Sequence, residues 1–161
     1  GNGFFVEERE KKVALVGGGV GVFPLISVLR QYQGKKEISA YIGYRNKDAV
    51  CGIEEFTKAT RFVGVTDDGS YGEKMNAVQA FQADLEKGNR PDVVLACGPT
   101  PMLRALKAVV ERENLQCYVS LEERMGCGIG ACLVCVCDMT SGQHARVCKD
   151  GPVFNSRDIS L

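Results

Sequence analysis

The chain has 161 residues, of which 45% are hydrophobic and 25% charged, and its formal net charge is +0. This length suits one domain of usual size, alone or with a small satellite, and the composition is that of an ordinary globular protein. The balanced charge argues against a nucleic-acid or anionic-membrane partner, and no apolar stretch is long enough to span a bilayer. Because the sequence also shows no signal peptide, we expect a cytoplasmic protein.

Residues 12–122 show the pattern of an α/β domain. Residues 1–11 are polar and mixed, and we interpret them as a linker from a domain that precedes Gly1. Short apolar runs rich in β-branched residues then predict five strands, at 12–17, 37–45, 61–68, 92–98 and 116–122. Helical patterns cover 22–33 and 100–114. Strands that alternate with helices predict a doubly wound domain over residues 12–122, built around a five-stranded parallel sheet.

A glycine-rich turn follows the first predicted strand. Its glycines are Gly17, Gly18, Gly19 and Gly21. Glycines at this place allow a tight turn and let backbone N–H groups approach a phosphate, and the N-terminus of the next helix favours negative charge. The standard G-x-G-x-x-G spacing is not met, because Val22 occupies its last position. We predict a pyrophosphate-binding turn, with a plain strand-to-helix turn as the alternative.

Charged residues after the second and third strands bear on the choice of nucleotide. Arg45 ends the second strand and would favour the 2′-phosphate of NADP. Asp67 and Asp68 follow the third strand, where they would repel that phosphate and accept hydrogen bonds from ribose hydroxyls, unless they simply form a solvated turn. Because two carboxylates oppose one guanidinium, we expect the nucleotide to be NAD. Cys97 ends the fourth strand, either beside the nicotinamide or as a small core residue.

The pattern changes after Glu122, and residues 123–161 predict a small Cys-rich β module. This module holds five of the eight cysteines of the chain. The spacing C-x4-C-x2-C, followed by one more cysteine, is that of a plant-type [2Fe–2S] cluster. The predicted ligands are Cys127, Cys132, Cys135 and Cys148. The single histidine of the chain, His144, excludes a Rieske centre, which needs two histidines.

Three alternatives for the cysteines remain. A structural zinc site usually takes two separated C-x2-C pairs, and only Cys132 and Cys135 form one. A disulfide framework is disfavoured because a chain of this length can support its own core and because the cysteines are clustered. Cys137 is close enough to compete as a ligand, and we interpret it as structural, with Cys148 as the fourth ligand.

The two predicted cofactors differ in the number of electrons that they exchange. A nicotinamide exchanges a hydride, which carries two electrons, and a [2Fe–2S] cluster exchanges one. A flavin is therefore needed between them. We recognise no flavin-binding segment in this sequence, so we expect the flavin on a preceding domain or on a partner.

Taken together, these motifs resemble one family. The segments "GNGF", "VGGGVGVFPL", "GYR", "TDDGSYG", "ACGPTPML" and "ERMGCGIGACLVCVC…VCKDGPVF" are similar to the electron-transfer subunit of type B, NAD-dependent dihydroorotate dehydrogenase, a ferredoxin-reductase-like flavoprotein. The resemblance covers essentially the whole chain. The nucleotide motifs alone would indicate only the wider superfamily, and the combination with "MGCGIGACLVC" is the specific part.

The resemblance implies an oxidoreductase component of three parts. These are an N-terminal FAD-binding barrel that is absent here, an NAD-binding domain and a [2Fe–2S] module. It implies that dihydroorotate is oxidised at FMN in a separate catalytic subunit, within a heterotetramer, and that electrons pass through the cluster and FAD to NAD⁺ in pyrimidine biosynthesis. We expect the present chain not to be active alone, and we predict no catalytic residue in it.

Carried over by motif, the site residues fall into two groups. The nucleotide residues are Gly18, Gly19 and Gly21 at the pyrophosphate, Asp67 at the ribose, and Cys97, Gly98 and Pro99 near the nicotinamide. The cluster ligands are the four cysteines given above. A related NAD(P)H–ferredoxin-type or hydrogenase-linked reductase subunit would share this fold and these cofactors but have a different partner. A nucleotide sensor with a structural zinc would bind nucleotide and have no reducible centre.

Overall fold

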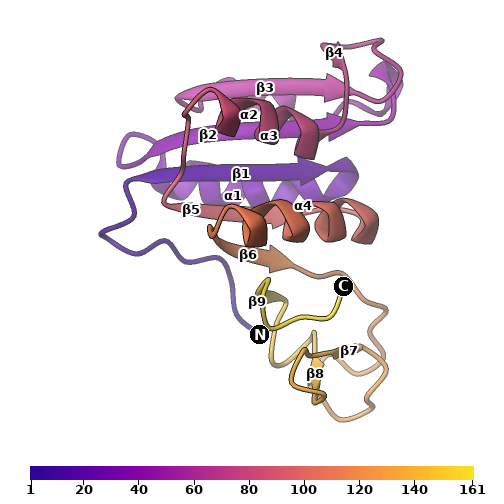
Figure 1. The fold of residues 1–161 in the computed structure, drawn as a ribbon. Coiled ribbons are helices and arrows are strands. Elements are labelled where there is room, and N and C mark those ends of the chain that lie inside the picture. The colour runs from indigo at the N-terminus through magenta and orange to yellow at the C-terminus, as the bar shows by residue number, and fades with distance from the viewer.

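The computed structural model describes residues 1–161, and five parallel strands form the centre of its sheet (Figure 1). They are β1 (Lys12–Gly18), β2 (Glu37–Tyr44), β3 (Arg61–Thr66), β5 (Val93–Cys97) and β6 (Gln116–Ser120). Their order is β3-β2-β1-β5-β6, and every neighbouring pair among them is parallel. The strands predicted from the apolar runs are therefore confirmed.

The predicted number of strands was wrong, because the sheet has seven. The two further strands lie at its edges: β4 (Glu73–Lys74) pairs in parallel with β3, and β9 (Val153–Asn155) pairs antiparallel with β6. Both are too short to show a two-residue periodicity in the sequence. Since β9 follows the Cys-rich segment, the chain returns from that module to the edge of the main sheet.

Helices cover both faces of the sheet (Figure 1). One face carries α1 (Val22–Tyr32), which follows the short turn η1 (Gly19–Gly21), and α2 (Ile53–Phe56), which follows η2 (Lys47–Ala49). The other carries α3 (Ala77–Glu86) and α4 (Thr100–Arg112). Helix α3 is not among the predicted elements, although Asn76 and Gln79 form a capping box at its start.

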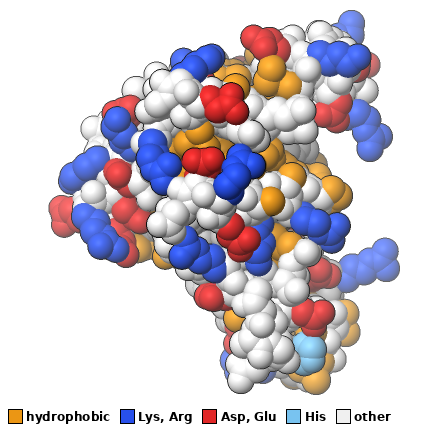
Figure 2. Space-filling model, in the orientation of Figure 1, with side chains coloured by type: hydrophobic (Ala, Val, Ile, Leu, Met, Phe, Trp, Pro, Cys, Tyr) orange, Lys and Arg blue, Asp and Glu red, His pale blue; other side chains and the backbone are white.

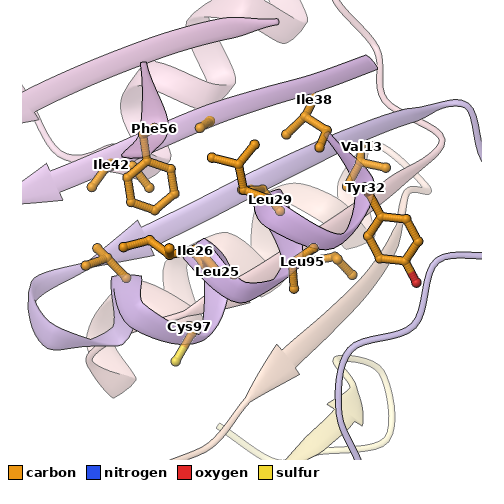
Figure 3. Packing of buried hydrophobic residues seen from close by; sticks show 14 of the residues in the cluster. Val13, Leu25, Ile26, Leu29, Tyr32, Ile38, Ile42, Phe56, Leu95 and Cys97 are labelled. Carbon is orange, nitrogen blue, oxygen red and sulfur yellow. The ribbon is translucent and has the colours of Figure 1, made fainter. Parts of the chain in front are cut away.

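The core holds the carboxyl ends of the strands in place. Beneath α1, the packed side chains are those of Leu25, Ile26, Leu29 and Tyr32 against the sheet (Figure 3). On the other face, the rings of Tyr41 and Phe81 meet edge to face with their centroids 5.4 Å apart. Burial of each large aliphatic side chain contributes about 1.5–3 kcal/mol. The loops at the strand ends are therefore carried by a rigid support.

The Cys-rich segment folds into a small module beside β6 (Figure 1). Its hairpin pairs β7 (Val136–Asp138) antiparallel with β8 (His144–Arg146). The five buried residues of its core are Cys135, Ala145, Val147, Phe154 and Ile159. Because this core is so small, most of the loop that precedes β7 is left at the surface.

Residues 1–11, which we call the N-terminal strap, run from beside β9 to the start of β1 (Figure 1). Val6 is buried in the core under α1, and its N–H donates to the hydroxyl of Tyr32 at 3.2 Å. The ammonium of Lys36 donates to three strap carbonyls, at 2.7, 3.1 and 2.7 Å, those of Glu7, Glu8 and Glu10. This segment therefore has fixed contacts along its length.

The surface shows no segregation of charge on the face drawn in Figure 2, where Lys and Arg side chains alternate with Asp and Glu. None of the helices combines the length and the apolar character needed to cross a membrane.

Candidate functional site

Two hollows meet at the glycine turn, at the carboxyl edge of the parallel sheet. The outer hollow, of about 530 Å³, lies beside Gly43, Arg45 and Asp67. The module-side hollow, of about 470 Å³, lies between the turn, the start of α4 and the Cys-rich module. Gly18, Gly19 and Pro99 line both, and an elongated ligand can therefore cross the turn from one hollow to the other. Ligands of open α/β sheets bind at this edge.

The glycine turn is shaped for close backbone approach. A Cβ atom on Gly21 would lie 2.7 Å from the carbonyl carbon and oxygen of Cys97, so only glycine lets the start of α1 pack against the end of β5. No side chain caps the first N–H groups of η1 or α1. Free N–H groups at a helix start form an anion site, which fits the predicted pyrophosphate-binding role.

The two neighbouring aspartates after β3 have different surroundings. Asp68 accepts hydrogen bonds from the backbone N–H and the hydroxyl of Ser70, at 2.9 and 2.6 Å, and these bonds lower its pKa. Asp67 lines the outer hollow, and its carboxylate forms no ion pair. Arg45 lines the same hollow, also without an ion pair. Asp67 and Arg45 are therefore both free to meet a nucleotide.

Cys97 lies at the predicted strand end, but its thiol is fully buried in the core beneath α1 (Figure 3). Burial raises the pKa of this thiol to about 11, so it stays protonated at neutral pH. Its neighbours Gly98 and Pro99 line the module-side hollow, whereas Cys97 itself does not. The Cys97 side chain therefore acts here as a small apolar residue, and the backbone after it borders the hollow.

The charged residues of the module-side hollow are not among the site residues predicted from the sequence. Glu122 and Glu123 line it just after β6, facing Arg104 of α4 and Asp138 of β7. A usable signal was present, because the two glutamates directly follow the last strand, and the carboxyl ends of parallel strands share one edge.

The loop with the first three cysteines wraps around the sulfur of Cys127. This sulfur accepts backbone N–H groups from Ala131 at 3.2 Å and from Cys132 at 3.4 Å. Gly130 has a φ of +82°, and a Cβ on it would lie 2.7 Å from Cδ of Lys149. Leu133 has a φ of 59°, which is uncommon for a residue with a side chain. Such backbone conformations cluster at ligand-binding sites.

The backbone around these sulfurs favours thiolates at two of the four cysteines. The N–H of Ile129, followed by the N–H and the thiol of Cys132, lowers the pKa of Cys127 to about 6. The N–H and the thiol of Cys148 lower the pKa of Cys135, and the Cys135 sulfur in turn raises that of Cys148. Since thiolates are the metal-binding form, this environment suits metal ligation.

The direct contacts among the four cysteines join them in two pairs. Cys127 lies beside Cys132, and Cys135 accepts the N–H of Cys148 at 3.4 Å. The structure has no group of three or more His, Cys, Asp or Glu side chains placed to hold one metal ion. A [2Fe–2S] cluster takes two cysteines for each iron, which is the pairing seen here. The donor set therefore fits a [2Fe–2S] cluster.

Cys137 points to a different part of the module. Its thiol donates to the carbonyl of Ala145 at 3.5 Å, within the β7–β8 hairpin, and the residue lines the module-side hollow. Burial raises its pKa, which disfavours the thiolate. These contacts agree with our interpretation of Cys137 as structural and leave Cys148 as the partner of Cys135.

Two family models match the chain. Residues 15–108 match the oxidoreductase NAD-binding domain, and residues 122–160 match the iron–sulfur cluster binding domain of dihydroorotate dehydrogenase B. The first match ends within α4, and the second begins just after β6, where the α/β pattern stops.

Curated relatives share the whole chain. It is 43% identical to the dihydroorotate dehydrogenase B (NAD(+)) electron transfer subunit of Geobacillus kaustophilus, over 100% of the chain and 63% of that protein. It is 38% identical to the subunit of the same name from Caldanaerobacter subterraneus subsp. tengcongensis, over 99% and 63%. The chain thus spans less than two thirds of the length of these relatives.

Solved structures share the fold. The NADH-dependent reduced ferredoxin–NADP oxidoreductase is similar with a TM-score of 0.74 and 26% identity, over 94% of the chain and 55% of that structure. The C-terminal domain of a hydrogenase from Pyrococcus furiosus is similar in fold, with a TM-score of 0.55 and 14% identity, over 75% and 100%.

Proposed function

Because this chain belongs to the oxidoreductase NAD-binding domain family and carries an iron–sulfur domain of the dihydroorotate dehydrogenase B type, we propose that it serves as an electron-transfer component of that enzyme. In this function, electrons from the oxidation of dihydroorotate pass through a [2Fe–2S] cluster and FAD to NAD⁺, in pyrimidine biosynthesis. The relatives that match over the full chain carry this name.

One observation carries the proposal: the glycine turn and strand β7 of the Cys-rich module border the same hollow. The module-side hollow is bordered by Gly18 and Pro99 from the nucleotide loops and by Val136 and Cys137 from the module. A nicotinamide that crosses the glycine turn therefore reaches the hollow that the module also borders. This juxtaposition is what an electron-transfer component needs.

The proposed site residues follow this arrangement. Gly18, Gly19 and Gly21 hold the pyrophosphate with their backbone N–H groups, and Asp67 accepts from the ribose hydroxyls. Gly98 and Pro99 border the nicotinamide, and Cys97 supports them from below. The cluster ligands are Cys127 with Cys132 and Cys135 with Cys148.

The domains and the location of the protein belong to the same proposal. Residues 1–11 connect to an FAD-binding domain, residues 12–122 bind NAD, and residues 123–161 hold the cluster. The partner is an FMN-containing catalytic subunit within a heterotetramer. We place the protein in the cytoplasm, because the reducing conditions there keep cysteines available as thiolate ligands.

A related reductase with a ferredoxin-type partner is the second candidate. The similarity in fold to the ferredoxin–NADP oxidoreductase, over 94% of the chain, favours it. The higher identity of 43% to the dihydroorotate dehydrogenase B subunit favours the first candidate. Co-purification distinguishes the two candidates. An FMN-containing subunit that oxidises dihydroorotate should be captured with this chain if the first candidate is correct, and a ferredoxin-type partner if the second is.

Electron counting provides the test of the proposed function. We expect dithionite to bleach the visible absorption of the anaerobic chain, and NADH alone to leave it unchanged over minutes, because hydride and one-electron chemistry need a flavin between them. Added FAD should let NADH bleach the same absorption. Fast bleaching by NADH without flavin, or no bleaching by dithionite, would contradict the proposal.

A further inference from the structure

The N-terminal strap links the main sheet to the cluster module. At one end, Val6 is buried in the core under α1 and Lys36 binds the strap carbonyls. At the other end, Asn2 contacts the segment that follows Cys148, about 150 residues away in sequence. Since one end of the strap is fixed to the main sheet and the other to the segment after Cys148, the strap can hold that segment in place relative to the sheet.

Asn2 completes the free edge of the sheet. Its side-chain oxygen accepts the N–H of Val153 at 2.9 Å, and its side-chain nitrogen donates to the carbonyl of the same residue at 3.0 Å. The amide thus takes the place of a neighbouring strand along β9. Asn2 also donates its backbone N–H to the carbonyl of Gly151 at 2.6 Å and its side-chain N–H to that of Asp150 at 3.3 Å. All four bonds go to residues 150–153.

A continuous set of contacts leads from this segment to the cluster loop. The carboxylate of Asp150 binds the guanidinium of Arg146, with Nε at 2.9 Å and Nη2 at 3.1 Å, and Arg146 donates to the carbonyl of Gly130 at 3.2 Å. Cys148 lies in the turn between Arg146 and Asp150, and its N–H donates to the sulfur of Cys135. The turn that carries Cys148 is therefore held from one side by Asn2 and from the other by the cysteine loop.

We propose that Asn2 is a positioning residue for the cluster. Its bonds fix residues 150–153 against the strap and thereby determine the position of the Cys148 sulfur. The proposal rests on the proposed function, in which Cys148 is the fourth ligand. The other strap contacts, at Val6 and Lys36, support the core of the main sheet. Loss of the Asn2 side chain should thus act on the module and leave that core intact.

The experiment compares three variants of the full chain with the wild type. Asn2→Ala removes the side-chain bonds. Asn2→Asp keeps an acceptor for the Val153 N–H and loses the donor. Asn46→Ala is the matched control, because the Asn46 side chain also accepts two backbone N–H groups, those of Asp48 and Ala49, at a place remote from the module. The readouts are hydrogen exchange of the cluster-free chain, the electron paramagnetic resonance spectrum of the dithionite-reduced chain, and the rate of iron loss to a chelator.

We expect Asn2→Ala to speed exchange at the Val153 amide and over residues 146–151 by about fivefold, the effect of losing a typical hydrogen bond. We also expect it to broaden or shift the resonance spectrum and to speed iron loss by about the same factor. Asn2→Asp should be intermediate, and Asn46→Ala should match the wild type. Unchanged exchange and an unchanged spectrum in Asn2→Ala, or the same changes in Asn46→Ala, would overturn the proposal. Exchange is read without a cluster, so a wild type that binds no iron would refute the proposed function separately from the role of Asn2.

Discussion

At the scale of single residues, two aspartates that are adjacent in sequence have distinct roles. The carboxylate of Asp68 is engaged by Ser70, whereas Asp67 lines the outer hollow with Arg45. We predict that Asp67→Asn tightens binding of NADPH relative to NADH by about tenfold, because one negative charge near the 2′-phosphate is removed.

The control is Asp68→Asn, which removes the same charge one residue away and should leave the preference close to that of the wild type. Titration of each variant with both nucleotides measures the ratio of dissociation constants. An equal change in this ratio in both variants would show that Asp67 and Asp68 influence the bound nucleotide equally, which would contradict the prediction.

The cysteines permit a second comparison at this scale. Cys148 donates its N–H to the Cys135 sulfur, whereas the thiol of Cys137 is bonded to Ala145. We predict that Cys148→Ser loses most of its iron and that Cys137→Ser keeps an iron content close to that of the wild type. Iron analysis after anaerobic purification tests this, and retention of iron by Cys148→Ser with loss in Cys137→Ser would reverse the assignment.

The sequence leads directly to a hypothesis for the cluster ligands, but it does not show where the Cys97 side chain points, for a physical reason. Three of the predicted ligands lie within one short loop, so spacing alone describes their geometry. The position of the Cys97 thiol depends on which face of β5 it occupies. A buried strand with an apolar run on both faces does not reveal that face.

At the scale of elements, the loop around Cys127 depends on glycine at a crowded left-handed position. Gly130 has a φ of +82° and its missing Cβ leaves room for Lys149. Gly142 in the β7–β8 hairpin has a φ of +81° but open space around it. Both alanine substitutions carry the backbone cost of about 1–2 kcal/mol, and only Gly130→Ala adds a clash beside the cluster loop.

We therefore predict that Gly130→Ala lowers cluster occupancy well below that of Gly142→Ala, while both lower the free energy of unfolding. The ratio of cluster absorbance to protein absorbance reports occupancy, and urea unfolding of the cluster-free chains reports stability. Equal occupancy in the two variants would mean that the backbone conformation alone matters.

The contact between β3 and α3 predicts a dependence on pH. The nearly buried carboxylate of Asp84 accepts from Arg61 Nη2 and from the Tyr41 hydroxyl, both at 2.9 Å. Burial acts to raise its pKa, but the bonds from Arg61 and Tyr41 outweigh it and hold the pKa below the ordinary value of 3.8. The ionised form thus stabilises the fold, fully above pH 3.8, and this contribution is lost as the pH falls below that value.

We predict that Asp84→Asn costs about 2 kcal/mol of unfolding free energy at pH 7, the value of hydrogen bonds to a charged group, and less at pH 3. Urea unfolding of the wild type and the variant at both pH values measures the difference. A difference that stays constant between them would show that the charge of Asp84 plays no part.

The sequence predicts the central strands and two of the three long helices, but it misses α3 and the short strands. The five central strands show continuous apolar runs, and α1 and α4 show helical periodicity. In contrast, β4 and β9 span two and three residues, and they form because neighbouring strands offer free edges. Tertiary pairing of this kind leaves no periodic pattern for sequence analysis to detect.

At the scale of the whole molecule, chain segments far apart in sequence meet at the carboxyl ends of the parallel strands and along the edge strand β9. The glycine turn near residue 20 and the module after residue 122 border the same hollow, and the N-terminal strap reaches the segment after Cys148. The parallel topology explains why the glycine turn and the module border one hollow, because the carboxyl ends of parallel strands lie at the same edge of the sheet. The contact between the strap and the segment after Cys148 depends on Asn2, and no sequence pattern indicated it.

The most direct test of the central claim, a two-iron cluster on four cysteines beside a nicotinamide site, is metal and sulfide analysis of the anaerobically purified chain. The account predicts two iron atoms and two acid-labile sulfides per chain. One zinc per chain with no iron and no sulfide would contradict it.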